Sequence, residues 1–290
     1  MRAFGLEERV IHALSEDIGF GDITTEILVG DERRKARIVA EELGVLAGIR
    51  EAKILFERMA LRVTPKMNDG DKVEKIGTTV MIIEGSAKAI LMCERTALNF
   101  LMRMSGIATA ISKTIEKARK VNPGIRIAVT RKTAPLLRYF DKRAAEIGGG
   151  DTHRFRLDDC ILIKDNHLAL VGDVETAIGI ARNKASFSKK LEIEVENTED
   201  CLRAAKAKAD IIMLDNMKPD QIKHTIYELK NQGLREKVTV EASGGITFEN
   251  IDEYAATGVD VISMGSLTHS VKALSLSLEL MESHLSKDGK

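Results

Sequence analysis

The sequence is poor in several residue types that define particular protein classes. It has 290 residues with no tryptophan, only four prolines and three cysteines, and aromatic residues make up 4% of it. The cysteines (Cys93, Cys160 and Cys201) form no C-x-x-C pair and leave one over. A disulfide framework and a structural zinc site are therefore not expected, and a reducing compartment is.

Long apolar segments are also missing. No run approaches the roughly 18 apolar residues that a membrane helix needs. The amino end, residues 1–9, lacks the apolar core of a signal peptide. We therefore expect a cytoplasmic protein that makes no contact with a membrane.

The chain carries no net charge, because its 44 basic side chains are balanced by 44 acidic ones. Domains that bind nucleic acid usually have a basic excess, so we expect no nucleic-acid partner. The hydrophobic content of 44% and the charged content of 30% are ordinary for a globular protein. Any dense group of cations must therefore be a local feature.

Cations gather at the ends of two short apolar runs. Residues 125–129 lead into Thr130-Arg131-Lys132, and residues 160–163 lead into Lys164-Asp165. A Gly-Gly-Gly triplet followed by His153-Arg154 stands between the two runs. Short apolar runs are typical of buried parallel strands. Cations just past the carboxyl ends of such strands hold anionic substrates in α/β enzymes, so the pattern predicts a substrate with several negative charges.

The first part of the chain, residues 1–105, has the pattern of an α+β sandwich domain. Asn68-Asp69-Gly70 is a strong turn signal between extended segments. We expect the final residues, 271–290, to join this domain through a helix over 271–285. The expected strands are 36–40, 44–48 and 79–83, and the expected helices are 51–60 and 87–104, the latter ending at Ser105-Gly106.

Residues 106–270 alternate between helical and strand-like patterns, which predicts parallel βαβ units. Six strands are expected, whereas a complete barrel needs eight. The pattern alone therefore leaves open a doubly wound sheet or an incomplete α/β barrel. The expected strands are 125–130, 160–163, 191–196, 210–214, 237–241 and 260–264, and the clearest helices between them are 202–209, 219–231 and 248–256.

Acidic residues alternate with apolar ones in the third of these strands. Glu192, Glu194 and Glu196 share one face, which would point into a barrel. Buried carboxylates are costly unless they pair with cations or a metal. Lys132, Lys164 or a divalent cation could pair with these carboxylates. The alternative is that the three acids lie on the solvated face of an edge strand.

Glycines follow the last two expected strands, at Ser243-Gly244-Gly245 and at Gly265-Ser266. Glycine lets backbone N–H groups approach a phosphate closely, and a phosphate site after the last two barrel strands recurs in such folds. Other charged residues carry less weight. His153 and His167 have no metal-ligand spacing with a third histidine or cysteine, and we expect Lys142-Arg143 to lie on a solvated helix face.

Together these residues resemble the quinolinate phosphoribosyltransferase family, the carboxylating nicotinate-nucleotide pyrophosphorylases of NAD biosynthesis. The resemblance spans nearly the whole chain. Its motifs are Glu16 to Thr24, Glu94-Arg95-Thr96-Ala97-Leu98-Asn99, Thr130-Arg131-Lys132-Thr133, Gly148-Gly149-Gly150 with His153-Arg154, Ile163 to His167, Glu194-Val195-Glu196, Leu214-Asp215-Asn216 and Ser243-Gly244-Gly245.

The resemblance implies an α+β sandwich domain followed by an incomplete α/β barrel of parallel strands. It implies a homodimer with shared active sites, with a hexamer of three dimers as a further option. It also implies a glycosyltransferase that converts quinolinate and phosphoribosyl pyrophosphate into nicotinate mononucleotide, pyrophosphate and CO2, with magnesium as cofactor.

The resemblance also implies roles for individual residues. Quinolinate carboxylates would bind Arg131, His153 and Arg154, with Arg95 from the partner subunit. Lys132 and Lys164 would face the pyrophosphate and the reacting ring, and Glu194 and Asp215 would hold the ribose hydroxyls and magnesium. The remaining implied substrate-binding residues are Thr130, Ser243, Gly244, Gly245, Gly265, Ser266, Leu267 and His269.

Two departures from the family pattern remove no charged group. Thr152 replaces a common Asn, and Ala134-Pro135-Leu136 replaces Thr-Pro-Gly. Two other functions stay open at this point. One is a related phosphoribosyltransferase with another acceptor, such as nicotinate. The other is a non-catalytic nucleotide-binding protein, which would be expected to lose residues such as Lys132 and Glu194.

Overall fold

The computed structural model describes residues 5–281, which fall into two compact units. Unit 1 comprises the described residues up to 110 together with those from 271 onward, and unit 2 comprises residues 111–270. Within residues 5–281, no helix has both the length and the apolar character needed to cross a membrane.

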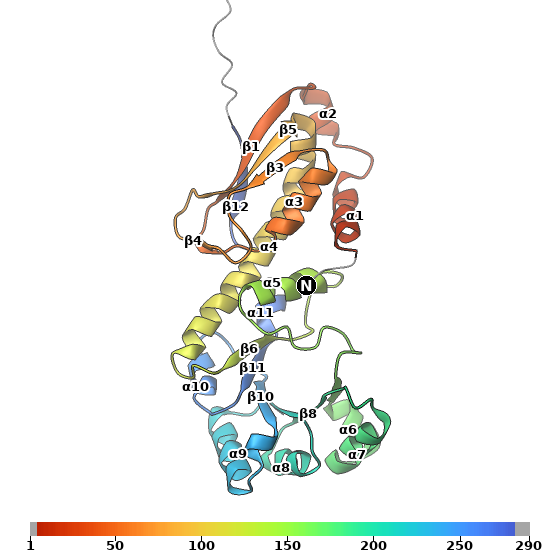
Figure 1. Cartoon of the computed structure of the whole chain (residues 1–290), viewed down its shortest axis with the longest axis vertical. Helices are drawn as coiled ribbons and strands as arrows, with labels where there is room; N and C mark the ends of the chain where they lie inside the picture. The colour runs from red at the N-terminus through yellow and green to blue at the C-terminus, as the bar shows by residue number, and fades with distance from the viewer. Residues whose placement is uncertain (1–4, 282–290) are drawn as a thin grey trace, which may run out of the picture. The chain divides into compact units, whose positions relative to one another are not determined.

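Unit 1 is built on an antiparallel sheet of four strands in the order β12-β1-β5-β3. Helix α1 (Leu6–Ile18) packs against α3 (Ile49–Arg58) beside this sheet (Figure 1). The short helix α2 (Ile23–Leu28) and a two-stranded sheet, β2 (Gly44–Val45) with β4 (Lys72–Val73), also belong to this unit. The strands of the main sheet are β1 (Arg33–Ala40), β3 (Arg62–Pro65), β5 (Thr79–Ser86) and β12 (Leu276–Leu280).

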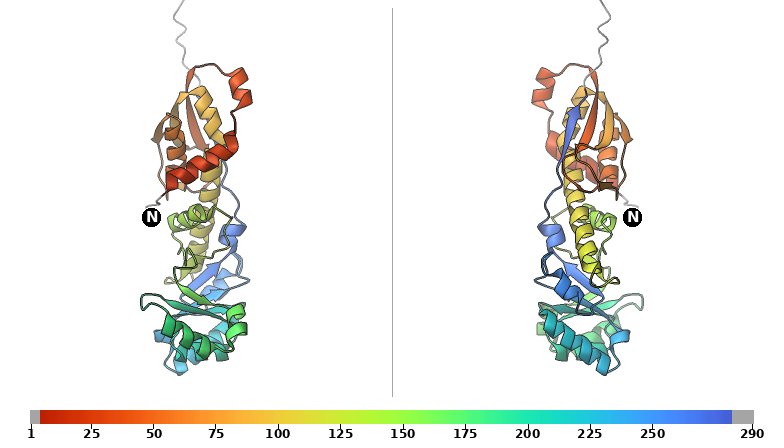
Figure 2. Two further views of the ribbon diagram at one scale, coloured as in Figure 1. Left: turned by 90° about the vertical axis from the view of Figure 1, so that its right-hand side faces the viewer. Right: turned by 90° about the vertical axis from the view of Figure 1, so that its left-hand side faces the viewer.

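The helix expected over residues 271–285 is wrong for the part that the structure describes, because residues 276–280 form strand β12. This strand pairs antiparallel with β1, and the right-hand view of Figure 2 shows the two side by side. The sequence held the strand signal, since leucines at 274, 276, 278 and 280 alternate with polar residues. Residues 282–285 lie outside the described part of the chain.

The helix expected over residues 87–104 is also longer than predicted, because α4 runs from Ala87 to Arg119. Gly106, taken as the helix end, lies inside it. A Cβ atom at this position would come within 2.2 Å of the Lys272 carbonyl oxygen. Glycine is therefore needed for a close approach of two backbone segments rather than for termination of the helix.

Unit 2 contains a parallel sheet of six strands, each within two residues of a predicted strand. The strand order is β6-β11-β10-β9-β8-β7. Neighbours follow the chain from β7 to β11, and the first strand, β6, adjoins the last. This is the cyclic order of an α/β barrel that is open between β6 and β7, and it excludes the doubly wound alternative. The strands are β6 (Arg126–Val129), β7 (Ile161–Ile163), β8 (Leu191–Val195), β9 (Ile211–Asp215), β10 (Thr239–Ser243) and β11 (Val261–Met264).

Helices α7 (Val174–Lys184), α8 (Thr198–Lys206) and α9 (Pro219–Asn231) lie along one side of this sheet (Figure 2). Their starts follow local capping rules. Asn197 accepts a hydrogen bond from the Asp200 N–H at 2.8 Å, and α9 begins with proline. The remaining elements of unit 2 are α5 (Arg138–Ile147), α6 (Asp165–Val171), the 3-10 turn η1 (Arg235–Lys237), α10 (Ile251–Ala255) and α11 (Ser266–His269).

Candidate active site

A pocket of about 340 Å³ opens at the carboxyl ends of the parallel strands of unit 2. Its size suits a small-molecule site. Every strand of the sheet contributes to it, either through its last residues or through the loop that follows. The lining residues are Thr130, Arg131, Lys132, His153, Arg154, Leu162, Lys164, Glu194, Met213, Asp215, Glu241, Ser243 and Ser263.

Nine residues implied by the family resemblance line this pocket, and seven do not. Four lining residues are not among those that the resemblance implies, namely Leu162, Met213, Glu241 and Ser263. Glu241 could have been found, because it lies two residues before Ser243 and therefore faces the same side of the strand. The predicted residues outside the lining are Arg95, which is exposed on α4 in unit 1, and Gly244, Gly245, Gly265, Ser266, Leu267 and His269.

The acidic face of β8 divides its carboxylates among different environments. Glu192 is fully buried, Glu194 is partly buried, and Glu196 is exposed beyond the end of the strand. Glu194 forms an ion pair with Lys164, one of the partners that the sequence left open, across the β7–β8 pair. Lys164 is held in place as the N-cap of α6, where its backbone N–H donates to His167 Nδ1 at 2.9 Å.

Glu194 and Asp215 project from neighbouring strands and offer carboxylate oxygens of the kind that Mg²⁺ binds. Mg²⁺ prefers oxygen ligands and typically takes one or two carboxylates together with substrate phosphates. Burial and the charge of Glu194 raise the pKa of Asp215, whereas Lys164 and Lys132 oppose that shift. A bound cation would relieve the same repulsion, so this pair fits the metal.

The open side of the barrel is partly filled by the segment that carries His153 and Arg154. Asp151 forms an isolated parallel bridge with Ala128 of β6, with its N–H donating to the Ile127 carbonyl at 2.8 Å. The segment then leaves the strand, because His153 has a left-handed φ of 50°. This turn brings the His153 ring and Arg154 into the lining of the pocket.

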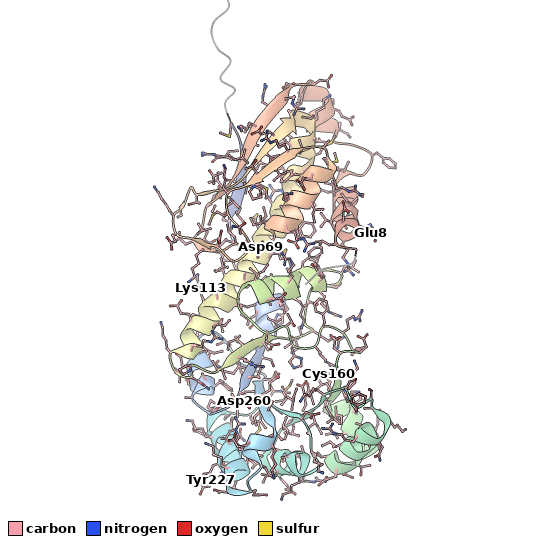
Figure 3. All side chains as sticks on the ribbon, viewed as in Figure 1. Glu8, Asp69, Lys113, Cys160, Tyr227 and Asp260 are labelled. Atoms are coloured by element: carbon pink, nitrogen blue, oxygen red, sulfur yellow. The ribbon has the colours of Figure 1, made fainter. Side chains whose placement is uncertain are left out.

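His153 lies between two buried carboxylates, an arrangement that the sequence did not predict. Its Nε2 atom is 3.3 Å from Glu192 Oε1 and 3.3 Å from Glu241 Oε2. Glu192 and Glu241 are 0% and 1% exposed. Cys160, labelled in Figure 3 next to the start of β7, adds a sulfur 4.0 Å from Glu192 Oε2.

The hydrogen bonds of the His153 ring determine where its proton sits. Burial lowers the pKa of His153, but the two glutamates outweigh burial and raise it. A doubly protonated ring is nevertheless opposed by geometry, because the Arg154 N–H donates to Nδ1 at 2.7 Å and needs an unprotonated nitrogen. We therefore place one proton on Nε2, between the glutamates. Burial also raises the pKa of Glu192, and this reduces the negative charge of the two glutamates around His153.

Two consequences follow for this histidine. A metal ion at His153, Glu192 and Glu241 is disfavoured, although their ligand atoms lie within 4.8 Å of one another, because Nε2 carries the proton. Both ring nitrogens already have protein partners, so His153 offers the pocket its ring edge rather than a free N–H donor. A direct contact between His153 and a substrate carboxylate, as the resemblance implies, stays a prediction.

Arginine side chains concentrate positive charge in the pocket. Burial, followed by the charges of Arg154 and Arg138, lowers the pKa of Arg131. Arg131 Nε is buried and has no hydrogen-bond partner within residues 5–281. A buried guanidinium nitrogen without an acceptor is costly. The site is therefore suited to an anionic ligand that supplies oxygen acceptors.

Lys142 does not lie on a solvated helix face, so this prediction is wrong. The residue is on α5 with an exposed fraction of 0%, and its ammonium group donates to three backbone carbonyl oxygens. The sequence gave no signal for this burial, because the three acceptors come from two segments outside the helix.

The glycine-containing loops after β10 and β11 are packed tightly. Gly244 has a φ of 86°, and a Cβ atom there would be 2.8 Å from the Asn216 backbone nitrogen. At Gly265, a Cβ atom would be 2.9 Å from Lys132 Cδ and 3.2 Å from His269 Cδ2. Thr268 Oγ donates to the Lys132 carbonyl at 2.8 Å, which ties α11 to the loop after β6.

One departure from the family pattern has a structural cost. Leu136, where the pattern has glycine, adopts a left-handed φ of 64° with a largely exposed side chain. This conformation costs a non-glycine residue about 1–2 kcal/mol. Leu136 does not line the pocket, so the departure leaves the charged groups of the site in place.

The fold and pocket define a class of enzyme, the open α/β barrels that bind anionic substrates at the carboxyl ends of their strands. Comparison with known proteins identifies the family. Residues 22–105 match the family described as quinolinate phosphoribosyl transferase, N-terminal domain, and residues 107–279 match the C-terminal domain of the same family. The chain belongs to the quinolinate phosphoribosyl transferase family.

Individual relatives agree with this assignment. A probable nicotinate-nucleotide pyrophosphorylase (carboxylating) of Methanothermobacter thermautotrophicus is 52% identical, covering 91% of this chain and 95% of the relative. The human nicotinate-nucleotide pyrophosphorylase (carboxylating) is 39% identical, covering 85% of this chain and 82% of the human protein. A crystal structure of NadC from Streptococcus pyogenes superposes with a TM-score of 0.89 at 37% identity, covering 97% of this chain and all of that chain.

Proposed function

We propose that this protein transfers the phosphoribosyl group of phosphoribosyl pyrophosphate to quinolinate, with decarboxylation. The products are nicotinate mononucleotide, pyrophosphate and CO2, and the reaction belongs to NAD biosynthesis. The observation that carries the proposal is the pocket, which is lined by Arg131 and Arg154 together with the Lys164–Glu194 pair. The chain that holds this pocket belongs to the quinolinate phosphoribosyl transferase family. A purified-enzyme assay for nicotinate mononucleotide tests it, and product from nicotinate instead of quinolinate would contradict it.

The acceptor would be held by its two carboxylates. Arg131 and Arg154 are positioned to bind them, and Arg131 has a buried nitrogen that needs an acceptor. Planar guanidinium groups suit carboxylates because they can donate two parallel hydrogen bonds. A rigid ring held in this way presents its nitrogen to the donor in a fixed orientation, which lowers the entropy cost of the reaction.

The donor would extend over the strand ends. Lys132 and Lys164 would face the pyrophosphate, whose departure leaves positive charge on the ribose. The carboxylates of Glu194 and Asp215 would stabilise that charge and bind the ribose hydroxyls. The same two residues would hold magnesium, which when bound neutralises charge on the leaving pyrophosphate. The ribosylated ring nitrogen is then cationic and withdraws electrons from the carbon that loses CO2.

The magnesium proposal predicts that chelation abolishes turnover. With excess EDTA, product formation should fall to the background rate, and added Mg²⁺ should restore it. Product formation at an undiminished rate in excess chelator would contradict the metal assignment. A melting curve recorded with chelator serves as the control, because loss of activity should not accompany unfolding.

The 5′-phosphate would lie against the backbone of Ser243 to Gly245 and of Gly265 to Leu267, near His269. Gly244→Ala should weaken binding of ribose 5-phosphate by on the order of tenfold, because the new Cβ would clash with the backbone of Asn216. Gly258→Ala is the matched control, since its φ of 91° carries similar backbone strain, but it lies outside these loops and its Cβ would make an ordinary contact with Ile226 at 3.5 Å. Equal affinities of the two variants, measured by calorimetry, would argue against the role of this contact.

We propose further that the protein acts in the cytoplasm as a homodimer. The support for an assembly is chemical, because Arg95 belongs to a family motif but does not line the pocket of unit 2. A partner subunit's Arg95 would add a further cation for the quinolinate carboxylates. A hexamer of three such dimers is compatible with the same shared sites.

A further inference from the structure

Lys142 is a fully buried cation held by backbone oxygens. Its Nζ atom donates to the carbonyls of Val129 at 3.0 Å, of Arg154 at 3.1 Å, and of Thr152. A lysine ammonium has three N–H donors, so all of them are in use. Burial lowers the pKa of Lys142 to about 8, which leaves the group mainly protonated at neutral pH.

The three carbonyls belong to the two segments that carry the pocket arginines. Val129 is the last residue of β6 and is followed by Thr130 and Arg131. Thr152 and Arg154 flank the left-handed His153. The ammonium group therefore joins the end of β6 to the segment around His153, on the open side of the barrel.

Regular strand pairing cannot provide this connection. The ladder between β6 and the second segment ends at Asp151, whose carbonyl accepts from the Val129 N–H at 3.0 Å. The turn at His153 then directs the chain away, so the Val129 carbonyl receives no backbone N–H from the next residues. Lys142 supplies the missing donor and satisfies the carbonyls on either side of the turn.

The connection also works against electrostatic repulsion. Arg154 and Arg138 each lower the pKa of Arg131, which shows that these cations repel one another. Without a ligand, repulsion between Arg131 and Arg154 favours separation of the two segments. Three hydrogen bonds from a buried side chain oppose that separation at a point next to both arginines.

We propose that Lys142 is a positioning residue that fixes the separation of Arg131 and Arg154 for a ring bearing two adjacent carboxylates. The proposal rests on the proposed function, in which these arginines bind quinolinate. Lys142 acts through the backbone of the two segments and does not itself line the pocket.

Binding of two probes tests the proposal. Benzene-1,2-dicarboxylate reports on the arginine pair, and ribose 5-phosphate reports on the loops after β10 and β11. The Lys142→Met variant keeps the length of the side chain but removes its donors, and Lys142→Gln keeps a polar end. We expect the dissociation constant of the dicarboxylate to rise about tenfold or more in Lys142→Met, because small misplacements of binding groups can cost on the order of 10²-fold. Ribose 5-phosphate should bind within about twofold of wild type.

Kinetics provide a second readout that a purely structural role would not produce. The KM for quinolinate should rise in both variants, whereas the KM for phosphoribosyl pyrophosphate should change little. Lys223→Met is the matched control, because Lys223 is an exposed lysine of α9 that pairs with Asp220 on its own helix at 3.3 Å. This control should match wild type in both binding and kinetics.

Several results would overturn the proposal. Unchanged dicarboxylate binding in Lys142→Met would show that the arginines do not depend on this lysine. Equal loss of both probes would show a general effect on unit 2, as would failure of both Lys142 variants to fold at low temperature. Wild-type protein that does not bind the dicarboxylate, yet binds ribose 5-phosphate, would overturn the proposed function and this proposal with it.

Discussion

Replacement of Lys164 with alanine should lower turnover by on the order of 10²–10³-fold while the protein stays folded. Lys164 is 39% exposed at the end of β7 and pairs with Glu194, whose side chain is only 16% exposed. The substitution removes a cation that would face the pyrophosphate. It also leaves Glu194 without its ion-pair partner, whereas little apolar packing is lost.

The measurement is the rate of nicotinate mononucleotide formation, together with a thermal melt. Lys53→Ala is the matched control, because Lys53 is also 39% exposed and pairs with Glu57 at 2.6 Å, but lies on α3 in unit 1. An exposed pair of this kind contributes about 0.5 kcal/mol or less, and its loss should leave turnover unchanged. Near wild-type turnover of Lys164→Ala would exclude a catalytic role. An unfolded variant would indicate that Lys164 serves mainly to neutralise the buried acids.

Mixing two inactive variants, Arg95→Ala and Lys132→Ala, should restore roughly a quarter of wild-type activity under conditions that exchange subunits. If the partner's Arg95 completes each pocket, a mixed dimer has one site with both groups and one with neither. About half of randomly paired subunits form mixed dimers, and each of these has one intact site of two, given the twofold pairing that is commonest in oligomers.

The control for this experiment is a mixture of Lys132→Ala with Lys164→Ala. Both of these residues line the same pocket of unit 2, so every site in every mixed dimer lacks one of them. No activity should return in that mixture. Absence of recovery in the first mixture, with exchange confirmed by mass spectrometry of tagged subunits, would mean that Arg95 serves its own subunit or no site at all.

Local sequence patterns were sufficient for most elements of unit 2. The parallel strands are short and mostly apolar, so all six were located to within two residues, and the polar residues at their carboxyl ends followed directly. Alternation along β8 predicted which acids share a face, whereas the sequence left open which cation pairs with them, and the structure pairs Glu194 with Lys164. These features depend on neighbours in sequence or on the periodicity of a single strand.

The errors arose where the sequence pattern was misread or where distant segments meet. Strand β12 was taken for a helix although its leucines alternate, and Gly106 was taken for a helix end although it serves the approach of Lys272. Strands β3 and β4 were not predicted, because each is short and pairs with remote residues. In these cases the partner decides the structure, and a single-sequence pattern does not identify the partner.

The sequence by itself determined the strand ends, the charges placed there and, through its motifs, the family. Only the tertiary structure decided that the barrel is open between β6 and β7, that Glu192 and Glu241 enclose His153, and that Lys142 is buried. The physical reason is that a charged side chain is buried only where partners from other segments compensate for its lost hydration. Lys142 finds such partners in the carbonyls at the end of β6 and in the segment around His153, and no pattern along α5 could have identified them.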